Sequence, residues 1–254
     1  MSQIKIIPIA SGSSGNCMLV EIENKRVIID LGVTAKMLKS VLSLNGFNPS
    51  DTDAVLITHT HSDHVKGLPV CMKCIKAPVY ASSATKATLC LDDVKELPYL
   101  MRTEICPGLF ATAFRTSHDA AGSAGFLVET EQVRFGLVTD TGFISDDIKK
   151  VLAGADCIVI ESNHDQQMLR EGPYPVYLKR RILSDKGHLS NDACGEALQF
   201  FASAGTNHFL LAHLSRENNT PQTAYSSARK YLPDKNVTID VLPNFGKEAF
   251  IFDV

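Results

Sequence analysis

Short runs of apolar and β-branched residues alternate along the chain with stretches whose apolar residues recur every three or four positions. The apolar runs have the length of strands, and they predict strands near 4–9, 17–22, 26–30, 54–58, 110–114, 124–130, 133–139, 156–161 and 208–213, with a closing strand pair after the last helix. Helical spacing predicts helices over 34–45, 65–75, 83–91, 193–204 and 222–231. The first three strands form an antiparallel meander in this interpretation.

Strands lead each half of the chain, and helices follow them. Each sheet must bury an apolar face, so the order favours an α/β class (an α+β sandwich) in which two mixed β-sheets pack face to face with helices outside. The sequence contains neither a low-complexity linker nor a repeat with a period of 20–50 residues. We therefore expect one domain over residues 1–254.

Composition narrows the class of protein. Of 254 residues, 44% are hydrophobic and 21% are charged, which is typical of a globular domain and excludes a disordered chain. The formal charge of −3 excludes an extensive basic surface for polyanions. No apolar run is long enough to span a membrane, the first residues lack a secretory signal, and the seven cysteines favour free thiols. These features predict a cytoplasmic protein without a membrane segment.

A dense histidine motif follows the strand predicted at 54–58. It runs His59-Thr60-His61-Ser62-Asp63-His64, and three imidazoles this close repel one another when protonated and are costly to bury without partners. In an extended chain, residues two apart point the same way, so His59 and His61 can bind one ion. Asp63 and His64 can reach a second ion as the chain turns into a helix.

Two adjacent ions need more ligands, and the ends of later strands supply candidates. His118 offers a third ligand for the first ion, Asp140 can bridge both ions with its two oxygens, and His213 can complete the second site. Nitrogen and oxygen donors suit two divalent ions, Zn²⁺ or Mn²⁺, with Fe possible in the same set.

Such a pair of ions can hold a bridging hydroxide as the nucleophile for phosphodiester hydrolysis. Asp63 then has a catalytic role, because it can orient that hydroxide as well as bind metal. His188, in a polar loop before a helix, is the candidate general acid for the leaving alkoxide, although this stretch also reads as a simple helix cap.

Less specific motifs predict the residues that contact the substrate and those that orient the metal ligands. The loop 11–16 can present Ser13 and Asn16 to a phosphate, and a basic cluster near His188 can add local affinity. The cluster residues singled out are Arg180, Arg181 and Lys186. We also expect three residues to orient ligands or His188 without binding metal, namely Asp30, Glu161 and His164.

The order of these motifs resembles the metallo-β-lactamase superfamily over essentially the whole chain. Segments at 11–16, 161–165, 187–191 and 213–219 are most similar to its bacterial YycJ (VicX, WalJ) branch, which is related to ribonuclease Z. The resemblance implies the four-layer αβ/βα fold and a dinuclear, metal-dependent phosphodiesterase acting on nucleic acid. A DNA exonuclease is the activity it implies first, with DNA as the partner.

Two other functions stay open at the level of sequence. The same ligands serve a thioesterase of the glyoxalase II type or a lactonase, because an activated water attacks a carbonyl as readily as a phosphorus. A regulatory protein that binds metal without catalysis is the second alternative. The sequence leaves the oligomeric state open.

Overall fold

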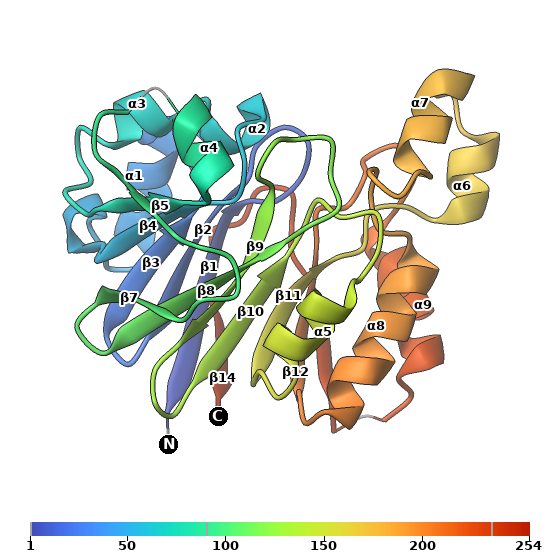
Figure 1. The fold of residues 1–254 in the computed structure, drawn as a ribbon. Helices are drawn as coiled ribbons and strands as arrows, with labels where there is room; N and C mark the ends of the chain where they lie inside the picture. Colours follow the sequence, from blue (N-terminus) through green and yellow to red (C-terminus); the bar gives the residue numbers. More distant parts are fainter. Residues whose placement is uncertain (1, 90, 235) are drawn as a thin grey trace.

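Two seven-stranded sheets pack face to face, and helices cover their outer faces (Figure 1). This arrangement comes from a computed structural model, which describes residues 2–89, 91–234 and 236–254. Both chain ends lie at one end of the sandwich, at the bottom of Figure 1, while α6 and α7 lie at the opposite end. The predicted α/β sandwich is confirmed.

The first sheet has the order β14-β1-β2-β3-β4-β5-β6. Strands β1 to β3 form the predicted antiparallel meander, and β3 to β6 run parallel. The strands are β1 Gln3–Ala10, β2 Cys17–Ile22, β3 Lys25–Ile29, β4 Ala54–Ile57, β5 Val79–Ala81, β6 Val94–Glu96 and β14 Phe250–Asp253.

The second sheet has the order β13-β12-β11-β10-β9-β8-β7, with β10 to β13 parallel. Its strands are β7 Thr103–Cys106, β8 Leu109–Arg115, β9 Ala124–Glu129, β10 Arg134–Val138, β11 Cys157–Glu161, β12 His208–Ala212 and β13 Thr238–Val241. The predicted closing pair is wrong, because β13 adds to β12 while β14 adds to β1 in the other sheet. Each strand thereby covers an edge that would otherwise expose unpaired backbone groups.

The helices are α1 Ala35–Leu44, α2 Ser62–Val65, α3 Leu68–Cys71, α4 Ser83–Thr88, α5 Asp146–Leu152, α6 Gln166–Glu171, α7 Val176–Ile182, α8 Asn191–Ser203 and α9 Pro221–Tyr231, with a 3₁₀ turn η1 at Pro49–Asp51. The single helix predicted over 65–75 is wrong: Pro69 lacks the N–H that would continue α2 into α3. The helix predicted over 83–91 ends earlier, at Thr88, and residue 90 lies outside the described residues. Patterning did not predict α5, α6 or α7.

Alternate side chains of each central strand enter different cores. In β4, Ala54 and Leu56 pack between the sheets, whereas Val55 and Ile57 pack under α1 and α3. In β11, Val159 faces the inter-sheet core and its neighbours face the core under α5, α8 and α9. Because both faces are buried, these strands are continuous apolar runs, which is why the sequence pattern identified them.

Within the described residues, no helix combines the length and the apolar character needed to cross a bilayer. The six cysteines of that part of the chain are free thiols.

Gly32 lies where three backbone segments meet, directly after β3. Its N–H donates to the Asn16 carbonyl at 2.8 Å, and the Asn16 N–H donates to the Asp63 carbonyl at 2.7 Å. A Cβ added to Gly32 would lie 1.6 Å from that Asp63 oxygen. Only glycine therefore lets the loop after β3 pass beneath the histidine motif.

We expect Gly32→Ala to destabilise the fold, because rigid backbone must move to admit the methyl group. The loss of unfolding free energy should reach about 2 kcal/mol or more, in the upper range for overpacking. Gly46→Ala is the matched control, because Gly46 has a φ of 80° but open space around it, so only the backbone cost of about 1 kcal/mol applies. Urea denaturation of both variants measures this, and equal losses would contradict the prediction.

Candidate metal centre

Polar side chains from several loops meet at one end of the two sheets. Most of them lie in the loops after β4, β8, β10 and β12, while Glu161 ends β11 and His188 lies in the loop between α7 and α8. Parallel strands place their carboxyl ends at one edge, so residues far apart in sequence are brought together there. Four groups of His, Asp and Glu have ligand atoms within 4.8 Å of one another among the described residues.

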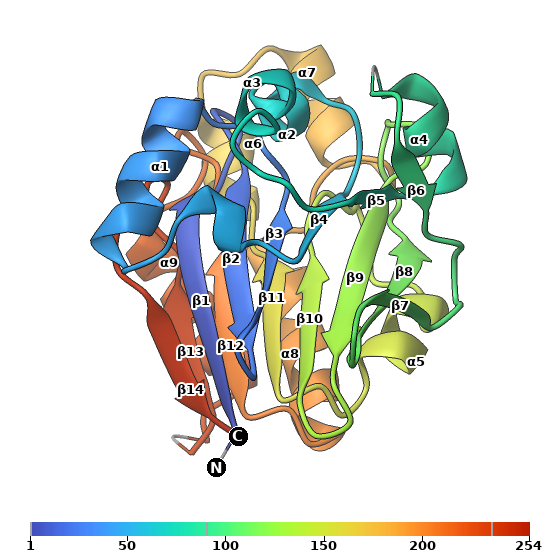
Figure 2. The ribbon, with the colours of Figure 1, turned by 90° about the vertical axis from the view of Figure 1, so that its left-hand side faces the viewer.

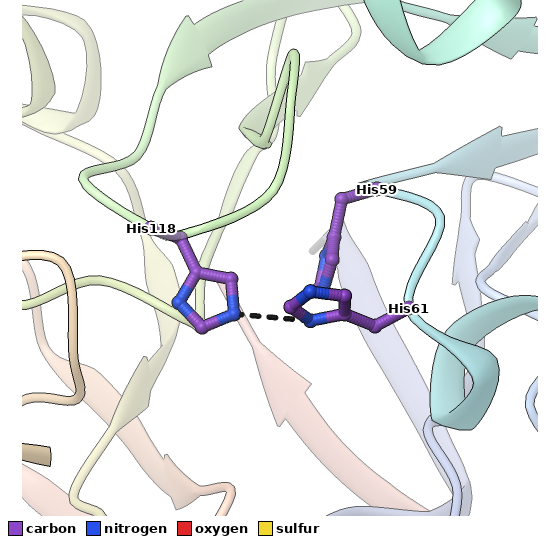
Figure 3. Close-up of side chains that lie close together, drawn as sticks. All are labelled: His59, His61 and His118. Carbon is purple, nitrogen blue, oxygen red and sulfur yellow. Dashed lines mark hydrogen bonds between the residues drawn. The ribbon is translucent and has the colours of Figure 1, made fainter. Parts of the chain in front are cut away.

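The first group contains His59, His61 and His118, and Figure 3 shows the three rings facing one another. His59 and His61 come from the end of β4, and His118 comes from the loop after β8. The ring atoms His118 Nε2 and His61 Nδ1 lie 3.3 Å apart. The predicted set for a first ion is thus gathered in one place.

The second group contains Asp63, His64 and His213. Asp140 lies between the two groups: one of its oxygens is 3.4 Å from His64 Nε2, and the other is 3.6 Å from His213 Nε2 and 3.8 Å from His118 Nε2. The two oxygens of Asp140 therefore lie near histidines of both groups.

Four imidazoles are held through the same ring nitrogen, Nδ1. In each, Nδ1 faces an acceptor behind the ring: Thr58 Oγ1 for His59, Asp30 Oδ2 for His64, the Gly187 carbonyl for His118 and Glu161 Oε1 for His213. With a proton on Nδ1, each ring turns the lone pair of Nε2 toward the centre. Metal-binding histidines are characteristically held in this way.

Asp30 supports the histidine motif from beneath. One carboxylate oxygen accepts the Thr58 N–H at 2.9 Å, and the other accepts the Thr58 hydroxyl at 2.8 Å and the His64 ring at 2.7 Å. These contacts hold the first residues of the loop and the His64 ring in place.

Glu161 holds two histidines with one oxygen. Its Oε1 lies 2.8 Å from His188 Nδ1 and 2.8 Å from His213 Nδ1, and its Oε2 accepts the N–H groups of Thr141 and Leu189. The contacts to His188 and Leu189 fix the loop that carries His188, and those to Thr141 and His213 tie it to the loops after β10 and β12. The predicted orienting residue therefore contacts both a candidate ligand and the candidate acid.

The backbone is also strained at these positions. Asp30, Asp140 and His213 have φ values of 58°, 55° and 56°, in the left-handed region that non-glycine residues rarely adopt. Such conformations cost of order 1–3 kcal/mol each and concentrate at functional sites.

Charge in the site favours a cation. Burial alone would raise the pKa of Asp140, but His213 and His64 outweigh it and hold that pKa well below its usual range. Burial would lower the pKa of His213, yet Asp140 and Glu161 raise it. Burial and the nearby His64 lower the pKa of His59 to about 2, so this ring is neutral and can act as a ligand.

The donor set fits divalent metal. Eight buried side-chain atoms of the described residues have no hydrogen-bond partner, and three of them belong to the candidate ligands, namely His59 Nε2, Asp140 Oδ2 and His213 Nε2. A cation would satisfy each of these three, whereas burying them unpaired costs free energy.

A cleft of about 160 Å³ opens beside the ligands. Its lining includes Ser13, Tyr174, Leu178, Arg181, His188 and His213. Tyr174, Leu178 and Arg181 belong to α7 and the segment before it, so this part of the chain forms one wall. A larger hollow of about 700 Å³ lies between α6, α8 and α9 and contains none of the candidate ligands.

The residues predicted to contact substrate lie in different settings. Ser13 and Arg181 line the cleft, whereas Arg180 and Lys186 are exposed and lie outside its lining. Asn16 is buried, and its amide nitrogen lies 2.9 Å from His64 Nε2 and 3.3 Å from Asp63 Oδ2.

His164 does not join the site through its ring. Both ring nitrogens are buried without a hydrogen-bond partner in the described part of the chain, and burial lowers the pKa of this ring to about 4. Its carbonyl accepts the Asn191 N–H at 2.9 Å, so it contributes through the backbone.

Sequence reasoning missed Asp119 and a buried amide network. Asp119 pairs with Arg181 at 2.6 Å and lies 3.6 Å from His61 and 3.4 Å from His118, so it ties α7 to the first ligand group. Its place directly after His118 was the available signal. Asn191 and Asn219 bond each other and join the loops after β11 and β12, which only the fold reveals.

Comparison with known proteins agrees with this geometry. Residues 25–214 match the family model described as Beta-lactamase superfamily domain. The chain is 36% identical to "Exodeoxyribonuclease YycJ" of Bacillus anthracis, covering 89% of this chain and 88% of that protein. It is 35% identical to "Exodeoxyribonuclease WalJ" of Streptococcus pneumoniae, covering 95% and 93%.

Among solved structures, the metallo-beta-lactamase fold protein YhfI of Bacillus subtilis superposes with a TM-score of 0.72, at 15% identity and over 98% of this chain and 99% of that one. At this identity the likeness concerns the fold alone. The family model and the two near-full-length relatives agree with the resemblance seen in the motifs, and the chain belongs to the beta-lactamase superfamily, with the metallo-β-lactamase fold.

Proposed function

We propose that residues 1–254 form a single-domain, metal-dependent nuclease that hydrolyses phosphodiester bonds in DNA as an exonuclease. The observation that carries this proposal is similarity to proteins named exodeoxyribonucleases over 89–95% of the chain, with the candidate ligands gathered at one cleft. The free thiols of the described cysteines fit a reducing cytoplasm.

The site would hold two divalent ions, Zn²⁺ or Mn²⁺, with Fe compatible with the same donors. His59, His61 and His118 would bind the first ion, and Asp63, His64 and His213 the second, with Asp140 between them. When bound, such ions supply Lewis acidity that polarises a phosphoryl oxygen and activates water. Asn16 would hold Asp63 in place, because its amide nitrogen donates to Asp63 Oδ2 at 3.3 Å.

His188 would protonate the leaving sugar oxygen. The Nδ1 atom of His188 is hydrogen-bonded to Glu161. The ring lines the cleft, and Nε2 is the nitrogen that remains to donate a proton there. Burial would lower the pKa of His188, but Glu161 and Asp140 outweigh it and raise that pKa, so the two carboxylates favour the protonated ring. Asp63, which is only partly buried, would orient the attacking water from the other side.

Ser13 and Arg181 would contact the substrate in the cleft. Both line it together with His188, and Arg181 is ion-paired with Asp119. Arg180 in α7 and Lys186 in the loop after it are both exposed, and they would contact phosphates farther along the polymer.

The first prediction concerns substrate class. With Mn²⁺ or Zn²⁺, the protein should degrade DNA oligonucleotides, and a chelator should abolish the reaction. A parallel assay with RNA, a cephalosporin and lactoylglutathione measures selectivity. Turnover of the thioester or lactam without any cleavage of DNA would overturn the proposed function.

Asp140→Ala tests the dinuclear arrangement. Protein purified without chelators should contain about two metal equivalents per chain, and the variant should lose most of them because it lacks the carboxylate between both groups. Metal analysis by mass spectrometry measures the ratio. Asp147→Ala, an exposed carboxylate on α5, is the control. One equivalent in the native protein, unchanged by Asp140→Ala, would refute two ions.

His188→Ala separates proton donation from metal binding. The variant should keep its metal, while kcat for DNA falls by about 10²–10⁴-fold. A diester with a 4-nitrophenolate leaving group should lose far less, because that group leaves without a proton. His208→Ala, at the far end of β12, is the control. Equal losses on both substrates would remove the acid role.

A further inference from the structure

Two cations converge on one residue at the rim of the cleft. The Lys66 ammonium donates to the Ser14 carbonyl oxygen at 2.6 Å, and an Arg216 Nη donates to the Ser14 hydroxyl at 2.7 Å. Lys66 ends α2, and Arg216 lies in the loop after β12, so the two come from different sheets. Both side chains are exposed.

Neither cation is neutralised locally. Within residues 2–89, 91–234 and 236–254, the arginines that form salt bridges are Arg26, Arg102, Arg134 and Arg181, and no lysine forms one. On the opposite wall of the cleft, Arg181 is compensated by Asp119. The uncompensated positive charge at this rim therefore comes from Lys66 and Arg216.

An exposed aromatic ring lies beside them. Phe245 is 51% exposed, and the Arg216 guanidinium carbon lies 5.5 Å from its ring centroid. The loop that carries Phe245 joins β13 to β14 at the same end of the sandwich (Figure 2). We call Ser14, Lys66, Arg216 and Phe245 the Ser14 ledge.

Hydrogen bonds tie this ledge to the ligands. The Ser11 hydroxyl accepts the His213 N–H at 2.9 Å, and the Ser11 N–H donates to the Asn244 carbonyl at 3.1 Å. Ser13, next to Ser14, lines the cleft with His188. The ledge is thus fixed in position relative to the proposed site of cleavage.

We propose that the Ser14 ledge binds a single-stranded segment of the nucleic acid beyond the bond that is cut. Lys66 and Arg216 would contact phosphates, and Phe245 would stack on an unpaired base. Alternating cationic and aromatic contacts are how proteins bind single strands without reading sequence. This inference rests on the proposed function, and it suits a chain whose net charge of −3 requires its phosphate contacts to be local.

Steady-state kinetics of the metal-loaded protein test the ledge. Arg216→Ala and Phe245→Ala should each raise KM for a single-stranded DNA oligonucleotide by about fivefold or more, with kcat changed by less than about twofold. Arg216→Ala should also reduce the salt dependence of log KM by about 0.7 for one lost phosphate contact. Phe245→Tyr should keep the native KM, because it keeps the ring.

Matched controls exist on the outer face of the second sheet. Lys149 lies 5.5 Å from the ring centroid of Phe200, which is 39% exposed, so Lys149→Ala and Phe200→Ala remove an equivalent pair away from the rim. These variants should leave KM unchanged. Bis(4-nitrophenyl) phosphate, which is too short to reach the ledge, should not respond to the ledge variants.

The outcomes separate the two proposals. Native KM values in both ledge variants, or equal shifts in the controls, would overturn the ledge while nuclease activity stands. If the native protein cleaves no nucleic acid, the proposed function fails. Fluorescence anisotropy with a labelled single-stranded oligonucleotide then tests whether the Ser14 ledge binds DNA. Binding that Arg216→Ala and Phe245→Ala weaken would support it, and unaffected binding would overturn it.

Discussion

Three buried carboxylates, those of Asp30, Asp140 and Glu161, set the constraint on which the site depends. A buried carboxylate needs positive charge and hydrogen bonds, since isolation from water is costly. Asp30 and Glu161 meet this need with backbone N–H groups and imidazoles, and they fix the orientation of those rings. Asp140 instead has one buried oxygen, Oδ2, without a hydrogen-bond partner in the described chain; it lies 3.4 Å from His64 Nε2, while the other oxygen lies near His118 and His213. The structure thus concentrates unsatisfied negative charge at the position where a cation is expected.

The two halves of the chain contribute unequal parts to this arrangement. The loop after β4 carries a contiguous block of ligands, whereas the loops of the second sheet provide single residues. The facing packing of the sheets brings these single residues to the block. Gly32 permits the close passage of backbone under that block, and left-handed φ values at Asp140 and His213 aim the single residues inward. Stability is given up locally so that the ligands converge.

The two walls of the cleft differ in how their positive charges are paired. On the α7 side, Arg181 is bound to Asp119, so its charge belongs to a network that reaches His61 and His118. On the other side, Lys66 and Arg216 rest on the neutral Ser14 and stay available to a polyanion. The Ser14 ledge therefore adds unpaired positive charge on the side of the cleft away from α7. The same asymmetry explains how a protein with a slight net negative charge can still attract phosphates at one point.

Local sequence patterns are enough to predict the fold class, most of the central strands and the block from His59 to His64. These follow from local patterns, because strands buried on both faces are continuous apolar runs and adjacent ligands need no tertiary information. They also point to His118, Asp140 and His213, since polar residues at strand ends stand out against apolar neighbours, and to His188 in a polar loop before a helix.

Only the tertiary structure decided which strands β13 and β14 join, how Asp119 links α7 to the ligands, and that Lys66, Arg216 and Phe245 lie together. Those contacts join residues up to 250 positions apart in the chain. No local periodicity encodes them, because they arise when separate loops are carried to one edge by the packing of the two sheets.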